Sequence, residues 1–129
     1  MQQFLFHASH QLLRLTNKLI LELKIKHWNI KNRNEYSLHL LTQRLYEELE
    51  ESLDTLAEEF RANSIVINET LMFCKPCNEP LETYKILKMK TEKLIEYVKI
   101  QKLYGLENTL SEFLSLICKH MYLYNDSKD

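Results

Sequence analysis

Two histidines, His27 and His39, bracket the polar stretch HWNIKNRNEYSLH, which lies between two segments with a helical pattern of leucines. Imidazole nitrogens are common ligands of transition metals, and together with carboxylates they suit Fe(II), Zn(II) and Mn(II). The stretch therefore leaves two alternatives open. The histidines are a matched pair of metal ligands, or they are unrelated side chains on either side of a turn.

A stripe of polar side chains begins at His39 and follows the next predicted helix. Its members are spaced by four, four, three, four and four residues, so they share one helical face; they are His39, Gln43, Glu47, Glu50, Asp54 and Glu58. A solvated surface is the ordinary explanation of such a stripe. Because a helix rises about 1.5 Å per residue, His39 and Asp54 are about 22 Å apart along its axis. They cannot bind the same metal ion within one chain.

Two copies of this helix in antiparallel contact would remove that separation. A two-fold axis near Tyr46 to Glu48 would place His39 of one copy beside Asp54 and Glu58 of the other. His27, at the end of the preceding helix, would add a second imidazole. The spacing therefore permits an intersubunit site for Fe(II), and Zn or Mn suit the same donors.

Four helical segments are predicted to position these residues in an all-α chain whose 129 residues form a single domain. Apolar residues recur every three or four positions in each segment, as Leu12, Leu15, Leu19 and Leu23 do in the first, and these leucines are expected to point inward. The predicted ranges are about Phe4 to Ile30, Glu35 to Ala62, Leu81 to Tyr104 and Glu107 to Tyr124. Asn32 and Asn34 are expected to cap or turn the chain between the first two segments. Gly105, the only glycine, is expected to end the third.

A connection with asparagines and prolines is predicted between the second and third helices, with room for a short helix from about Glu69 to Phe73. Four amphipathic helices with one long connection at this place make the ferritin-like form of the four-helix bundle. Cys74 and Cys77 form a C-x-x-C motif in the connection, which suits a redox pair or half of a zinc site. Cys118 is expected in the core.

Three further histidines are expected to have no part in a metal site. His7 and His10 share a helical face but are expected in an exposed first turn, and His120 is expected near the end of the last helix, where the helix dipole favours a cation.

Composition restricts the partners and the location of the protein. The net charge of −1 provides no general basic field for nucleic acid. No stretch approaches the roughly 20 uncharged apolar residues of a membrane span. An odd count of three cysteines suits a reducing compartment. We therefore expect a cytoplasmic protein without a membrane partner.

The segments HWNIKNRNEYSLH, LTQRLYEELEESLDTLAEEF and ENTLSEFLSLICKHMYLY resemble the Dps-type mini-ferritins (DNA-binding proteins from starved cells). The resemblance covers most of the chain and is weakest between residues 61 and 80. It implies a hollow, dodecameric shell that oxidises Fe(II), commonly with hydrogen peroxide, and stores ferric mineral. By position it implies that His27 and His39 bind metal from one subunit and that Asp54 and Glu58 do so from the other. Trp28 would lie next to this centre.

Two departures from the family pattern affect these expectations. The family usually has an aspartate where this chain has Gln43, and a neutral amide is a weaker ligand for iron than a carboxylate. The DNA-binding members often use a lysine-rich tail, whereas the C-terminus here carries Asp126, Lys128 and Asp129, so DNA binding through a basic tail is not expected.

Two main functions therefore remain open. The first is an iron-oxidising mini-ferritin in which acidic side chains nucleate the mineral, the candidates being Glu47, Glu48, Glu50 and Glu51. The second is a structural ferritin-like assembly subunit whose ferroxidase activity is weakened or lost because of Gln43. A free-standing helical bundle with an interaction role is a third alternative.

Overall fold

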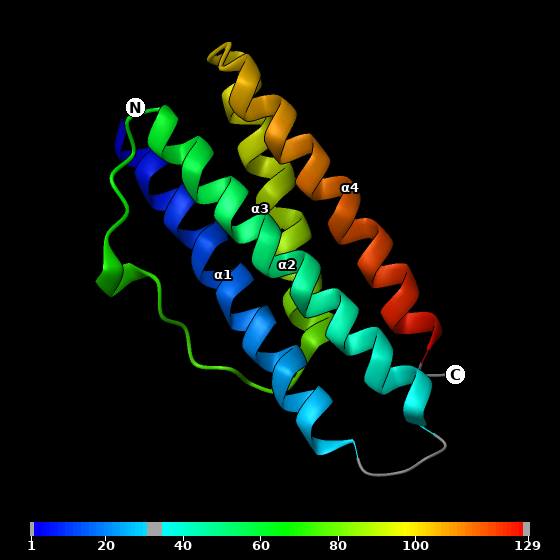
Figure 1. Ribbon diagram of the computed structural model, residues 1–129. Coiled ribbons are helices and arrows are strands. Elements are labelled where there is room, and N and C mark those ends of the chain that lie inside the picture. The colour runs from blue at the N-terminus through cyan, green and yellow to red at the C-terminus, as the bar shows by residue number, and fades with distance from the viewer. Residues whose placement is uncertain (1, 31–34, 128–129) are drawn as a thin grey trace.

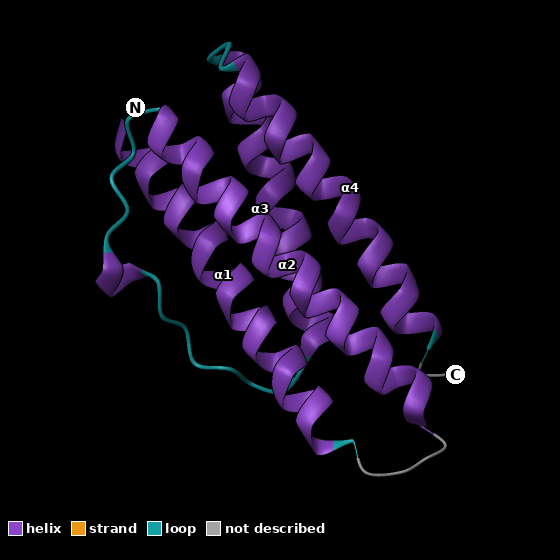
Figure 2. Ribbon diagram, viewed as in Figure 1, coloured by secondary structure: helices purple, strands orange, loops and turns teal. Residues whose placement is uncertain are grey.

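The computed structural model describes residues 2–30 and 35–127 and shows the predicted all-α four-helix bundle (Figures 1 and 2). Its helices are α1 (Gln2–Asn29), α2 (Tyr36–Ala62), α3 (Pro80–Ile100) and α4 (Tyr104–Asp126). The described part of the chain contains no strand. Each predicted helix is present, and its bounds differ from the prediction by about one turn or less.

The helices are arranged in two antiparallel pairs (Figure 1). α1 lies against α2 and α3 lies against α4, while α1 also contacts α3 and α2 contacts α4. α2 and α3 run in the same direction, so the segment 63–79 travels back along the outside of the bundle between them (Figure 1). This segment contains a short 3₁₀ helix, η2 (Glu69–Leu71), where the sequence suggested a helix to Phe73.

The predicted apolar stripes meet in the centre of the bundle. The first-helix leucines expected to point inward are all buried, and they contact buried residues of the other three helices; the core includes Leu12, Leu19, Leu23, Leu45, Leu49, Phe60, Tyr84, Leu87, Leu110 and Ile117. Full burial of one such side chain contributes about 1.5–3 kcal/mol to folding. Apolar burial therefore holds together the two helices that carry the candidate ligands.

The turn between α3 and α4 differs from the prediction. Gly105 does not end α3 but lies in the first turn of α4, and Lys102 makes the chain reversal with a φ of 59°. The Leu103 N–H donates to the Val98 carbonyl at 2.9 Å, and the Lys102 N–H donates to the Lys99 carbonyl at 3.1 Å. This is a Schellman motif, in which a left-handed residue after the helix satisfies the last carbonyls.

The end of α2 has the same motif, with Ser64 at a φ of 68° and the Ile65 N–H donating to the Phe60 carbonyl at 3.0 Å. The predicted turn residues Asn32 and Asn34 lie outside the described residues. Of the helices described, none has both the length and the apolar character required to cross a membrane.

Candidate functional site

The antiparallel contact of α1 and α2 brings His27 and His39 together. His27 lies in the last turn of α1, and His39 lies in the first turn of α2, at the same end of the bundle. The two imidazole rings are stacked, with centroids 3.8 Å apart and an angle of 20° between their planes. Two residues twelve positions apart in the sequence thus have their rings in direct contact.

Each ring of this imidazole pair is fixed by the backbone of the other residue. Nδ1 of His27 lies 2.8 Å from the His39 carbonyl oxygen, and Nδ1 of His39 lies 3.2 Å from the His27 carbonyl oxygen. A carbonyl oxygen can only accept, so each Nδ1 carries the hydrogen and donates it. In the neutral rings, the lone pair is then on Nε2. Metal-binding histidines are commonly oriented by such an N–H to carbonyl hydrogen bond.

Thr42 supports the same arrangement from the next turn of α2. Its buried hydroxyl donates to the His39 carbonyl at 2.9 Å and lies 3.3 Å from Nδ1 of His27. The oxygen can therefore accept part of the His27 N–H hydrogen bond while its own hydrogen is used elsewhere. The orientation of the pair thus depends on three polar contacts between α1 and α2.

Three exposed apolar side chains lie next to the imidazole pair or close to it in the sequence. Trp28 is 62% exposed, Tyr36 is 63% exposed and Leu40 is 48% exposed. The Tyr36 ring is stacked near that of His39, with centroids 6.3 Å apart. Exposed apolar side chains that gather at one place commonly mark an interaction surface.

The predicted carboxylate ligands do not join the imidazole pair within one chain. Asp54 and Glu58 are exposed on α2, and Asp54 is about 22 Å along the helix from His39. Among residues 2–30 and 35–127, no group of three or more His, Cys, Asp or Glu side chains could hold a metal ion. Gln43 turns its amide to Glu47, with Nε2 donating to Oε1 at 2.9 Å.

The four candidate mineral-nucleating glutamates have different surroundings. Glu47 is exposed and bonded to Gln43, whereas Glu50 forms an ion pair of 3.1 Å with Lys24 of α1. Glu48 contacts the interior of the bundle, as described below. Glu51 is exposed and lines a groove between α2 and α4. These four glutamates therefore differ both in exposure and in the groups that they contact.

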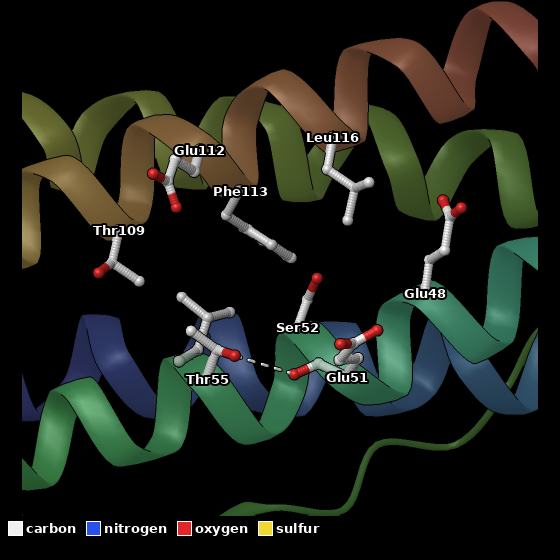
Figure 3. A pocket seen from close by; sticks show the side chains of 9 residues that line it. Glu48, Glu51, Ser52, Thr55, Thr109, Glu112, Phe113 and Leu116 are labelled. Carbon is white, nitrogen blue, oxygen red and sulfur yellow. Dashed lines mark hydrogen bonds between the residues drawn. The ribbon is translucent and has the colours of Figure 1, made fainter.

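The groove between α2 and α4 has a volume of about 290 Å³ (Figure 3). Carboxylates stand on both sides, with Glu48 and Glu51 on α2 and Glu112 on α4 (Figure 3). The hydroxyl groups of Ser52, Thr55 and Thr109 also line it, over a floor that includes Leu56 and Phe113. The groove is thus polar at its rim and apolar beneath.

A buried hydrogen-bond chain, not predicted from the sequence, connects three helices. Nε2 of His120 donates to Oε1 of Glu48 at 2.7 Å, and Nδ1 of His120 lies 2.8 Å from the Tyr84 hydroxyl. Because a carboxylate accepts, Nδ1 holds the lone pair that accepts the Tyr84 hydrogen. His120 was expected near the helix end, where the dipole favours a cation, but it is fully buried.

The pKa values in this chain follow from burial and from its hydrogen bonds. Burial lowers the pKa of His120 overall, although the Glu48 carboxylate opposes the effect. Burial alone raises the pKa of Glu48, but its bonds to His120 and Arg44 outweigh that and lower it. Burial also raises the pKa of Tyr84. Near neutral pH, this hydrogen-bond chain therefore consists of a neutral tyrosine, a neutral imidazole and an ionised carboxylate.

A second histidine is also buried against expectation. His10 was expected in an exposed first turn with His7, but it is only 1% exposed, whereas His7 is exposed. Nδ1 of His10 donates to the Phe6 carbonyl at 2.8 Å, and Nε2 accepts the Asn68 N–H at 2.9 Å. Both ring nitrogens are engaged, so His10 is a structural residue that holds the segment 63–79 to α1.

Comparison with known proteins identified no relative of this chain. No protein-family model matches the chain, and no match was found among curated proteins or among solved structures. The functional interpretation therefore depends on the residues themselves and on their geometry.

Proposed function

We propose that the protein is an iron-oxidising and iron-storing mini-ferritin of the cytoplasm, with hydrogen peroxide as the oxidant. The observation that supports it best is the imidazole pair. His27 and His39 hold each other's Nδ1–H groups on backbone carbonyls, which leaves Nε2 of each ring to bind Fe(II). The same donors also suit Zn or Mn.

The rest of the coordination sphere comes from a symmetry-related subunit in this proposal. Two copies of α2 in antiparallel contact bring Asp54 and Glu58 of the partner subunit to the imidazole pair. The exposed Trp28 and Tyr36 beside the pair give such a contact apolar surface to bury. Parallel α2 and α3 are also the connectivity of ferritin-like bundles, so a dodecameric shell is the proposed assembly.

The two kinds of donor have separate roles. Neutral imidazoles supply nitrogen ligands without adding charge, while the carboxylates of Asp54 and Glu58 offset the positive charge of the iron and favour its ferric state. Two Fe(II) ions each give one electron to hydrogen peroxide. The O–O bond breaks, and two protons complete two molecules of water. Ferric product then moves to the acidic interior of the shell.

A second candidate is a ferritin-like assembly subunit with weakened or lost ferroxidase activity. Gln43 favours it, because this residue brings an amide where a carboxylate would add charge to the site, and its Nε2 already donates to Glu47. In this alternative the imidazole pair and the subunit contact remain, but iron is bound too weakly for efficient oxidation.

Absorbance of the ferric-oxo product after addition of Fe(II) and hydrogen peroxide tests the proposal. The variants H27A and D54A should each suppress the absorbance, while H7A, which removes an exposed histidine from the other end of α1, should not. Size-exclusion mass shows whether each variant still assembles. Wild-type oxidation in both H27A and D54A would rule out the shared site, and a monomeric wild type would rule out both candidates.

A further inference from the structure

A buried carboxylate joins the end of the segment 63–79 to the bundle. Glu22 of α1 is 0% exposed. Its Oε1 accepts the Thr83 hydroxyl hydrogen at 2.6 Å, and its Oε2 accepts the Cys77 backbone N–H at 2.9 Å. The Cys77 thiol donates to the same Oε2, with a distance of 3.1 Å from sulfur to oxygen. Glu22 thus accepts three hydrogen bonds, one of them from a thiol.

Lys18 lies near the same carboxylate and interacts with the same thiol. Its side chain is 13% exposed, and its Nζ is 4.0 Å from Oε2 of Glu22. Burial alone lowers the pKa of Lys18, but its contacts with the Cys77 thiol and the Glu22 carboxylate outweigh that effect and raise it. The Cys77 thiol therefore donates to a carboxylate and also interacts with an ammonium group, and a nearby ammonium group is the kind of charge that favours a thiolate.

A second thiol is available three residues earlier in the chain. Cys74 is partly exposed, also interacts electrostatically with Lys18, and, like Cys77, is free. Residues 73–77 form neither a helix nor a turn. A disulfide requires the Cα atoms of Cys74 and Cys77 to lie within about 7 Å of each other, so its formation fixes the geometry of this segment.

We propose that Cys74 and Cys77 form a reversible, peroxide-oxidised dithiol in which Cys77 is the attacking thiol, Glu22 takes its proton and Lys18 stabilises its thiolate. This site is independent of the imidazole pair and requires no iron. It assigns a chemical role to the C-x-x-C motif and to a buried carboxylate that the proposed iron chemistry does not use.

The reaction balances with hydrogen peroxide as the oxidant. The Cys77 thiolate attacks one peroxide oxygen, the O–O bond breaks, and the leaving hydroxide takes the proton from Glu22 to become water. Cys77 is then a sulfenic acid. The Cys74 sulfur attacks the Cys77 sulfur, the S–O bond breaks, and the hydroxide leaves with the Cys74 proton as a second water. Two thiols are oxidised to one disulfide, and one peroxide is reduced to two waters.

Oxidation also changes how the segment 63–79 is held. A disulfide has no S–H, so Glu22 loses the thiol donor and keeps only its bonds from the Cys77 N–H and the Thr83 hydroxyl. The junction of this segment with α1 and α3 should therefore loosen on oxidation. Reduction of the disulfide restores the contact.

The remaining cysteine provides an internal control. Cys118 was expected in the core, but it is exposed on α4, as Cys77 is exposed in the segment 63–79. The full chain, free of metal, is exposed to hydrogen peroxide, and the remaining thiols are alkylated and located by peptide mass spectrometry. We expect a Cys74–Cys77 disulfide that a dithiol reductant reverses, with Cys118 still alkylated. Oxidation of Cys118 as fast as Cys77, or no disulfide, would overturn the proposal.

Three variants test the assigned roles. C74S should trap Cys77 as a sulfenic acid, which dimedone captures. E22Q keeps oxygen and nitrogen atoms in place but cannot accept the proton, so it should slow Cys77 oxidation about tenfold or more and shift its pH–rate profile. K18M should also slow Cys77 oxidation, and it provides the test if E22Q does not fold. E79Q removes an exposed carboxylate next to the motif and should leave the rate unchanged. Wild-type rates and pH profiles in both E22Q and K18M would overturn the proposal.

Discussion

Removal of the Glu48 carboxylate should weaken the bundle far more than removal of its neighbour Glu47. In E48A, the Nε2–H of His120 loses its acceptor. Because His120 is fully buried, this leaves a buried donor without a partner. An unsatisfied buried donor costs about 1–3 kcal/mol. The additional bond from Arg44 to Glu48 is at the surface and contributes little. We therefore expect E48A to lower the free energy of unfolding by about 2 kcal/mol.

E47A is the matched control, because Glu47 is exposed and bonded only to the side chain of Gln43 among the described residues. Its effect should stay within about 0.5 kcal/mol. For 129 residues, the entropy of unfolding is about 0.27 kcal/mol/K, so the loss in E48A corresponds to a fall in Tm of about 7 °C. Urea denaturation and calorimetry of the two variants measure the difference. Equal stability of E47A and E48A would refute the view that the hydrogen bonds linking Tyr84, His120 and Glu48 stabilise the bundle.

Three further predictions concern acid stability, a helix end and the iron site. Because the pKa of His120 is lowered from 6.5 on folding, the unfolded state binds its proton first. The stability from His120 is therefore complete above about pH 6.5 and is lost as the pH falls towards the folded-state pKa, with Glu48 adding a loss of the same sign at lower pH. Denaturation across this range should show a flatter pH dependence in H120Q, and an identical profile would contradict the assignment. K102G relieves a left-handed residue at the end of α3 and should raise the free energy of unfolding by about 0.5 kcal/mol, whereas a decrease in urea stability would argue against strain there. Q43D should raise the rate of Fe(II) oxidation, and equal rates in the two proteins would show that Gln43 has no part in the site.

The four helices were predictable because apolar periodicity reports directly which face of a helix is buried. The leucines at 12, 15, 19 and 23 were expected inward from spacing alone, and all four are buried. The end of α3 was not predictable from Gly105, because Lys102 adopts the left-handed conformation that a glycine would adopt more easily. The rule that glycine follows a helix is a statistical preference. The Schellman hydrogen bonds decide which residue takes the left-handed conformation.

The contact of His27 with His39 was foreseeable, since a short polar stretch between two helices places their adjoining ends together. The tautomer of each ring was not, because it depends on the position of the other residue's carbonyl oxygen. The burial of His10 and of His120 was not predicted, for a related reason. His10 and His120 bond to Asn68 and Glu48, which lie 58 and 72 residues away in the sequence. No local pattern indicates that a distant partner compensates for the burial of an imidazole.

The most direct test of the account is an anomalous-scattering map, measured at the iron absorption edge, of crystals of the assembled protein soaked in Fe(II). We predict a peak beside Nε2 of His27 and Nε2 of His39, completed by the carboxylates of Asp54 and Glu58 of the partner subunit. A map with no peak at the imidazole pair, in an assembly where no neighbouring subunit brings a carboxylate close to it, would contradict the shared iron site.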